Sequence, residues 1–206
     1  MLAFATAWAQ AAAQSSEWKQ LFNGKDLSGW KHVGSGRFTV EKGLLRTEGG
    51  MGLLYWEGGE VGNCVIRVVY RMEHPNDNSG VFIRIPEEPN EAWMPVNRGH
   101  EVQIDNSADD FHVTGVLYSL TKALARPGHP GPQWNTMEIT LDGPHTEVVL
   151  NGVKVTDYFE GQPVPPKEKW FEPDRGRRPM EGHIGLQNHS AQDVVYFKEV
   201  AVKKLK

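Results

Sequence analysis

The chain has a single cysteine, Cys64, in 206 residues. No disulfide can form within one copy of the chain, so a hydrophobic core must hold the fold together. Basic residues are not in excess either, since 22 Lys and Arg stand against 26 Asp and Glu and the formal net charge is −4. Such a chain has no positive field to hold a phosphate backbone, which excludes nucleic acid as a partner.

Long apolar runs are confined to the start of the chain. Residues 1–16 are apolar and alanine-rich, and they end in an Ala-x-Ala pattern at Ala11–Ala13 that is typical of a signal peptide. The positively charged start of such peptides is missing, so a stray apolar helix is the alternative. We expect residues 1–16 to be a leader and the protein to be exported. No later run approaches the roughly 20 apolar residues of a membrane helix, so we expect no membrane span.

Helical periodicity is also scarce, and alternation of apolar and polar residues takes its place. Cys64, Ile66, Val68 and Tyr70 share one face of a strand that we expect to be central. The same alternation predicts further strands over residues 79–86, 101–106, 136–141, 147–150, 153–158, 183–189 and 194–205.

Turn residues join these strands. Asn151-Gly152 lies between two apolar runs and fits a type I′ hairpin, and Asp142-Gly143 marks the reversal before it. Residues 134–158 are therefore predicted to form a three-stranded meander. Around ten strands in residues 17–206 imply an all-β fold of one catalytic domain, a two-sheet antiparallel jelly-roll sandwich rather than a closed barrel.

Two proline-rich segments do not fit the strand pattern. They cover residues 86–98 and 161–180, and each carries a tryptophan, Trp93 or Trp170. Long ordered loops of this kind are often lids or walls of a binding site. The alternative is a solvated crossover loop in which the tryptophan serves as an anchor.

One predicted strand carries three long polar side chains on the same face. Glu101, Gln103 and Asp105 alternate with Val102 and Ile104, which belong to the core, so the polar set must face outward. Neighbouring segments add Arg84 and Tyr118. An open concave face with acid, amide, guanidinium and aromatic groups suits a sugar, because hydroxyls need paired donors and acceptors. An ordinary solvated sheet surface is the alternative.

Several common catalytic motifs are missing. No Gly-x-Ser-x-Gly elbow and no Cys/His zinc spacing occur, which argues against serine nucleophile and zinc chemistry. Residues 75–80 and 105–110 are rich in oxygen donors, but neither fits a calcium-loop template, and both read as turns. A divalent metal held by Glu101 with His189 stays open.

Taken in order along the chain, seven segments resemble the 3-keto-disaccharide hydrolase family: WKQLFNGKDLSGW, NSGVFIR, GHEVQIDN, TGVLYSL, QWNTMEITLDG, VVLNGVKVTDY and GHIGLQNHSAQDVVYFKEVAVK. The resemblance runs from Glu17 to Lys206. It implies a concanavalin A-like sandwich, exported by bacteria to the periplasm or outside the cell, that cleaves glycosides already oxidised to a ketone at C3. Lys198 stands where the family usually has arginine, and Ser190 stands where it often has glycine. These departures leave the exact substrate open.

The chemistry of such a substrate differs from that of ordinary glycosidases. At about 3.3 Å per residue, the Cα atoms of Glu101 and Asp105 lie roughly 13 Å apart, beyond the carboxylate separations of about 5.5 Å and about 6.5–9.5 Å that those enzymes use. A ketone at C3 acidifies the C2 proton, so one base suffices to expel the C1 substituent by β-elimination. Water then adds back, or the enone is released.

The resemblance and this chemistry together suggest roles for eight residues. Glu101 or His189 would be the base, Arg84 or a bound divalent metal would stabilise the enolate oxygen, and Tyr118 would protonate the leaving group. The sugar would be held by four more residues: Gln103, Asp105, Trp134 and Gln187. Each has a plain structural alternative, such as Trp134 opening a strand or His189 closing a hairpin. A non-catalytic carbohydrate-binding module is the alternative function, because fold does not fix function.

Overall fold

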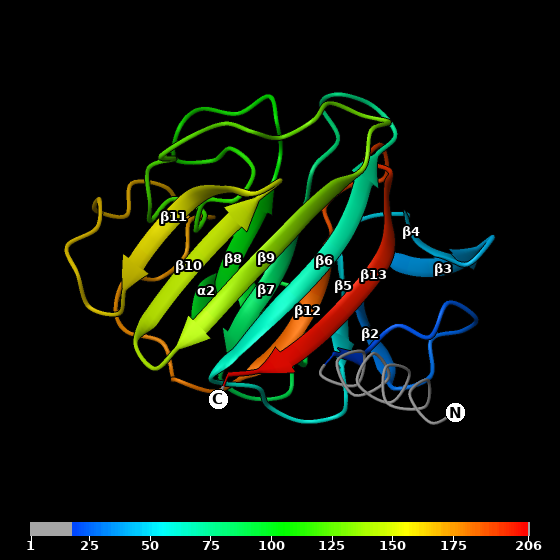
Figure 1. The fold of residues 1–206 in the computed structure, drawn as a ribbon, viewed down its shortest axis with the longest axis horizontal. Helices are drawn as coiled ribbons and strands as arrows, with labels where there is room; N and C mark the ends of the chain where they lie inside the picture. Colours follow the sequence, from blue (N-terminus) through cyan, green and yellow to red (C-terminus); the bar gives the residue numbers. More distant parts are fainter. Residues whose placement is uncertain (1–17, 206) are drawn as a thin grey trace, which may run out of the picture.

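Two antiparallel β-sheets packed face to face form the molecule, as Figure 1 shows. The structure is a computed structural model, and it describes residues 18–205. The predicted leader at residues 1–16 lies outside the described residues, and export stays a prediction. The predicted all-β sandwich is confirmed.

The large sheet has eight strands and the small sheet has five. The large sheet runs in the order β11 (Val153–Phe159), β10 (His145–Leu150), β9 (Asn135–Asp142), β6 (Cys64–Met72), β13 (Val195–Lys204), β4 (Leu44–Glu48) and β3 (Arg37–Glu41), with β1 (Lys19–Gln20) paired to β13. The small sheet runs in the order β2 (Trp30–Gly34), β5 (Gly52–Trp56), β12 (His183–Asn188), β7 (Ser79–Ile85) and β8 (His100–Ile104).

The predicted meander is present as β9, β10 and β11, paired in sequence order. Asn151 and Gly152 have φ of 50° and 81°, the left-handed values that a type I′ turn requires at both central positions. The predicted central strand is β6, which pairs with β9 and β13 and buries every second side chain. Alternation and turn chemistry therefore placed this half of the large sheet correctly.

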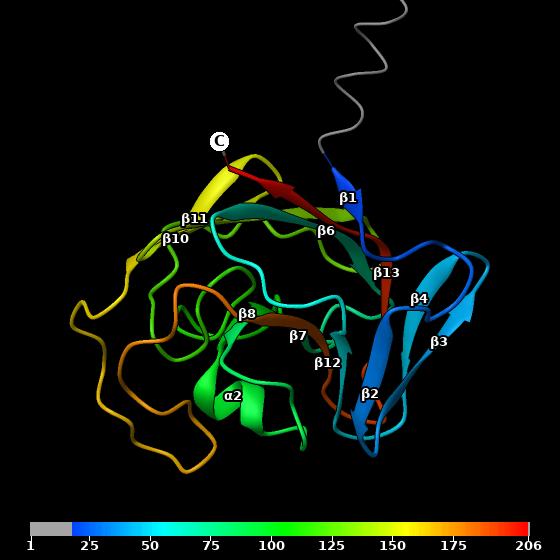
Figure 2. The same ribbon diagram turned by 90° about the horizontal axis from the view of Figure 1, so that it is seen from below.

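Side chains fill both faces of the small sheet. One apolar cluster lies between the sheets and contains Val81, Val102 and Leu186. A second cluster lies on the other face of the small sheet: Leu53, Tyr55, Phe82, Ile85, Met94 and Val96. Its last two residues come from the five-residue helix α2 (Met94–Arg98). Figure 2 shows α2 on the side of the small sheet that faces away from the large sheet.

Arg84 breaks the alternation of β7 and corrects an expectation from the sequence. Regular alternation would place it on the outer face with Gly80 and Phe82. Instead Arg84 has a left-handed φ of 53°, and the register between β7 and β12 shifts beside it. The bulge turns the side chain into the sandwich interior, where it is fully buried.

The guanidinium of Arg84 joins the two sheets. It donates hydrogen bonds to the carbonyl oxygens of Gly143 at 2.7 Å and Pro179 at 2.9 Å, and its Nε lies 3.8 Å from Glu160 Oε1. Arg84 therefore has a structural position and does not reach the outer polar face.

No helix within residues 18–205 has the length and apolar character needed to cross a membrane.

Replacing Arg84 tests this structural assignment. Arg84→Met leaves Glu160 with fewer partners in the interior, so we expect the free energy of unfolding to fall by about 3–5 kcal/mol. Arg37→Met removes the solvent-exposed ion pair with Glu48 and should change it by less than about 1 kcal/mol. Urea unfolding of both variants measures the difference. Equal small losses would contradict a buried anchoring role.

Candidate active site

A cavity of about 350 Å³ lies on the outer face of the small sheet. Its floor comes from the strands and their ends, and its walls come from the α2 segment and the loop at residues 161–180. The lining residues are Met51, Asn78, Trp93, Val96, Glu101, Gln103, Tyr118, Trp170, Phe171, Gln187 and His189. The sequence predicted an open concave face, but the loops cover it, so its polar groups are largely shielded from water.

The floor depends on strand alternation and on one glycine. Val102 and Ile104 of β8 pack between the sheets, so Glu101 and Gln103 face the cavity. Gly80 of β7 lies beside them, and a Cβ atom built there would come within 2.4 Å of Glu101 Oε1. A side chain at position 80 would therefore push the Glu101 carboxyl out of its place.

Glu101 is a buried carboxyl with few compensating partners. Only 6% of the residue is exposed. With its amino group turned toward Glu101, the Gln103 amide donates hydrogen bonds to Glu101 Oε1 at 3.2 Å and to the Ser79 carbonyl oxygen at 3.0 Å. Burial raises the pKa of Glu101 from 4.5 to about 8, and the charge of His189 and the amide of Gln187 oppose the rise only in part. Glu101 is therefore mostly protonated at neutral pH.

His189 is held by an aspartate that the sequence analysis missed. His189 Nδ1 lies 2.8 Å from Asp193 Oδ2. Asp193 also accepts hydrogen bonds from the Ser190 hydroxyl at 2.6 Å and the Asn78 N–H at 2.9 Å. The hydrogen bond that His189 donates to Asp193 raises the pKa of His189 above its ordinary value, and burial opposes the rise. With Nδ1 engaged, Nε2 is the ring nitrogen left to meet a ligand.

Tyr118 closes one side of the cavity. Its backbone N–H donates to the Glu101 carbonyl oxygen at 2.9 Å, because residues 114–118 run along the free edge of β8. Burial raises the pKa of Tyr118 to about 12, and the charges of Glu101 and Glu172 add to the rise. The phenol therefore keeps its proton and remains a hydrogen-bond donor.

Two other predicted residues lie outside the cavity. Asp105 sits behind its lining, where it accepts a hydrogen bond from Asn78 Nδ2 at 3.3 Å. Trp134 is further away, beside the large sheet, with its ring between Arg71 and Lys198, each 5.7 Å from its centre. Trp134 directly precedes β9. This position fits the structural alternative, in which Trp134 begins a strand and does not bind a sugar. Arg84, Asp105 and Trp134 are therefore corrections to the predicted site, because none of them lines the cavity.

The structure thus brings together five of the eight predicted residues: Glu101, Gln103, Tyr118, Gln187 and His189. It adds Asn78 and Phe171 as lining residues, and Asp193 as the partner of His189. The spacing of His189 and Asp193, four residues apart in one turn, was a signal that the sequence offered. Trp93 and Trp170 line the cavity, which favours the wall interpretation of both proline-rich loops.

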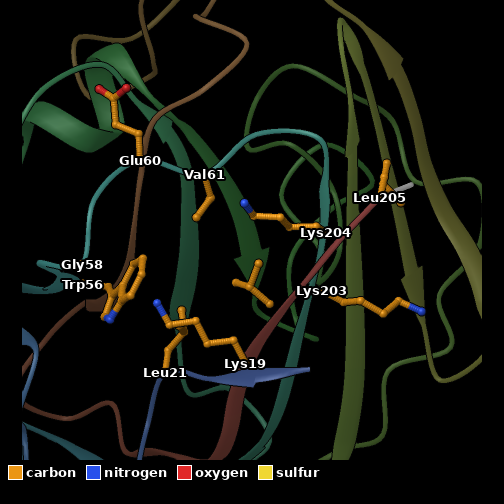
Figure 3. Close-up of a pocket in the computed structure, with 10 residues that line it drawn as sticks. Lys19, Leu21, Trp56, Gly58, Glu60, Val61, Lys203, Lys204 and Leu205 are labelled. Carbon is orange, nitrogen blue, oxygen red and sulfur yellow. The ribbon is translucent and has the colours of Figure 1, made fainter. Parts of the chain in front are cut away.

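A larger hollow of about 880 Å³ lies elsewhere, between β1, the end of β13 and the chain after β5 (Figure 3). Its lining is aliphatic and lysine-rich, with Lys19 Nζ 4.4 Å from the centre of the Trp56 ring. Its one lining carboxylate, Glu60, is exposed. None of its lining residues is a histidine, so this hollow does not have the pairing of a buried carboxyl with an imidazole that the smaller cavity has.

The described residues do not offer a protein cage for a metal ion. Within residues 18–205 no group of three or more His, Cys, Asp or Glu side chains is arranged to hold one. The sequence left open a divalent metal ion at Glu101 and His189. Such an ion would be held by these two side chains.

The raised pKa of Glu101 predicts how stability depends on pH. A carboxyl whose folded pKa is raised favours the native state most below its unfolded pKa, and this contribution is lost as pH rises through about 8. Glu101→Gln stays neutral, so relative to wild type it should gain on the order of 4 kcal/mol in free energy of unfolding between pH 4.5 and 8.5. Urea unfolding across this range measures it, with Glu147→Gln on the large sheet as the control. Parallel curves for wild type and Glu101→Gln would contradict the burial of a neutral carboxyl.

Known proteins resemble this chain in sequence and in fold. The family model of the 3-keto-alpha-glucoside-1,2-lyase-like domain matches residues 17–203. A crystal structure of a candidate glycosyl hydrolase from Parabacteroides distasonis is 25% identical, with a TM-score of 0.77 over 95% of this chain and 97% of that one. A search of curated proteins found no match.

More distant structures share the fold alone. A Bacillus subtilis protein with a galectin-like fold is 10% identical, with a TM-score of 0.63 over 91% of this chain and 94% of that one. The carbohydrate-binding module CBM66 from the same organism is 13% identical, with a TM-score of 0.58 over 85% and 96%. The concanavalin-like sandwich is confirmed, and the chain belongs to the 3-keto-alpha-glucoside-1,2-lyase-like family, as the resemblance in its sequence indicated.

Proposed function

We propose that this protein cleaves 3-keto-glycosides by removing the C2 proton and expelling the C1 substituent. Membership of its family indicates hydrolase or lyase activity on carbohydrate. The observation that carries the finer proposal is the buried carboxyl of Glu101 beside the His189–Asp193 pair in one cavity. An acid and a base in one shielded site suit proton transfer next to a ketone.

Unpaired amide oxygens in the cavity support a ligand with hydroxyl groups. Gln187 Oε1 and Asn78 Oδ1 are buried and accept no hydrogen bond within the part of the chain that the structure describes. Buried polar atoms are nearly always paired, and an amide oxygen accepts from a hydroxyl. A sugar in the cavity would satisfy both atoms.

His189 is assigned as the base. Asp193 fixes the imidazole orientation and stabilises the imidazolium that forms, while Nε2 takes the proton from C2. The sequence left Glu101 and His189 as alternative bases. The raised pKa of Glu101 supports His189, because a carboxyl that holds its proton at neutral pH serves poorly as a base there.

Glu101 takes the carbonyl-polarising role that the sequence gave to Arg84 or a bound divalent metal. As a neutral acid it donates a hydrogen bond to the C3 carbonyl oxygen, and this bond strengthens as negative charge moves onto that oxygen. The enolate then forms C1=C2 as the C1–O bond breaks. Tyr118 gives its proton to the departing oxygen. Water then adds to the enone at C1, or the enone is released as the product.

A second candidate function is carbohydrate binding without catalysis. The fold shared with a carbohydrate-binding module favours it. Binding alone needs aromatic and amide groups and gives no reason to bury a titratable acid beside an imidazole. Turnover therefore separates the two candidates.

The test uses methyl 3-keto-glucoside in D₂O, with product release and deuterium at C2 followed by NMR. Wild type should release methanol or exchange C2, with activity rising as His189 loses its proton and falling above about pH 8 as Glu101 loses its own. His189→Ala should lose activity by about 10²–10⁴-fold. Glu101→Gln should keep much of the activity and lose the alkaline decline, because its amide N–H still donates.

Glu147→Gln, a half-buried carboxylate on β10, is the matched control and should behave as wild type. An inactive Glu101→Gln, combined with wild-type activity that rises through pH 8, would make Glu101 the base and reject our assignment. Binding of 3-keto-glucosides without any turnover would favour the second candidate.

A further inference from the structure

Two exposed tryptophans stand at the mouth of the cavity. Trp170 is 76% exposed and Trp93 is 37% exposed, yet both line the cavity. Their ring centres lie 5.5 Å apart, with 50° between the ring planes. Exposed aromatic surface at the edge of a polar cavity is a feature of sites that stack a ligand ring.

Hydrogen bonds hold the two tryptophan-bearing segments together. Arg178, at the end of the loop that carries Trp170, donates from Nε to the Gly99 carbonyl oxygen at 2.8 Å and from its terminal nitrogen to the Asn97 carbonyl oxygen at 3.0 Å. Both acceptors lie at the end of the α2 segment that begins at Trp93. The pair is thus held in place before any ligand arrives, which lowers the entropy lost on binding.

The loop itself is also tied internally. Arg175 donates to the carbonyl oxygens of Pro165 at 2.8 Å and Pro173 at 2.6 Å, and to Glu172 Oε2 at 2.9 Å. These bonds span the residues on either side of Trp170. The exposed indole is therefore presented by an ordered loop.

The cavity separates polar from aromatic groups. The acid, the imidazole and the amides lie on the small sheet or directly beside the ends of its strands, whereas both tryptophans come from the covering segments. Carbons 1 to 3 of a 3-keto sugar must meet Glu101 and His189 on the sheet. The C1 substituent has to depart through the mouth, so it is the part of the substrate that passes Trp93 and Trp170.

We infer that Trp93 and Trp170 form a stacking platform for the group that leaves from C1. This inference rests on the proposed function and deepens it. The substrates it selects are 3-keto-glycosides whose leaving group is a ring with an apolar face, either a second pyranose or an aromatic aglycone. Small alkyl leaving groups gain nothing from the platform.

The test compares three 3-keto-glucosides that differ only in the leaving group: methyl, glucosyl and phenyl. Each variant is compared with wild type on the same substrate, so differences in leaving-group acidity cancel. Trp170→Ala and Trp93→Ala should lower kcat/KM about tenfold for the glucosyl and phenyl substrates and less than about twofold for the methyl substrate. Trp170→Phe should recover most of the loss.

Trp134→Ala is the matched control, since Trp134 is 38% exposed beside the other sheet and should alter none of the three rates. Thermal unfolding of every variant checks that it is folded. Equal losses on all three substrates would make the tryptophans a general cover and overturn the platform, as would no loss on any. A wild type inert toward all three substrates would instead overturn the proposed function, and the platform with it.

Discussion

The desolvation of one carboxyl group governs the site. Glu101 projects from the face of β8 that strand alternation turns away from the core, where a carboxylate would ordinarily meet water. Helix α2 and the loop at residues 161–180 cover that face and leave Glu101 buried. Desolvation outweighs the opposing charge of His189, so the carboxyl keeps its proton, and a neutral acid can donate to a carbonyl oxygen.

A second buried glutamate shows what Glu101 lacks. Glu160 lies in the sandwich interior, where His100 Nε2 is 2.6 Å from Oε1 and the Arg178 N–H donates to Oε2 at 2.9 Å. Burial by itself raises the pKa of Glu160, but these bonds and the charge of Arg84 bring it below its ordinary value. The same side chain is thus a structural anion in one place and a neutral acid in the other, because their partners differ.

Stability and the candidate chemistry consequently depend on different faces of the small sheet. The interior between them carries the apolar cluster and the network of Arg84, His100 and Glu160, which anchors the ends of the covering loop. The outer face of the small sheet carries the acid, the imidazole and the amides. Gly80 keeps room for the acid, so packing and candidate chemistry depend on different faces of the same strands.

Local pattern in the sequence was sufficient where strands are regular. It predicted the meander, the central strand and the outward face of Glu101 and Gln103, because a period of two needs no tertiary information. It failed where tertiary structure overrides the pattern. The bulge at Arg84 reverses a side chain. β5, from Gly52 to Trp56, is buried on both faces and shows no alternation to find. How far the loops cover the polar face depends on long-range contacts that no local pattern contains.

The protonation state of Glu101 tests this account most directly. Carbon-13 NMR of protein labelled at glutamate side-chain carboxyls, with Glu101→Gln used to assign the resonance, gives its titration midpoint. The account predicts a midpoint near pH 8, with the carboxyl neutral at pH 7. A midpoint near the ordinary value of 4.5 would show a solvated carboxylate and would contradict the role of Glu101 as a neutral acid.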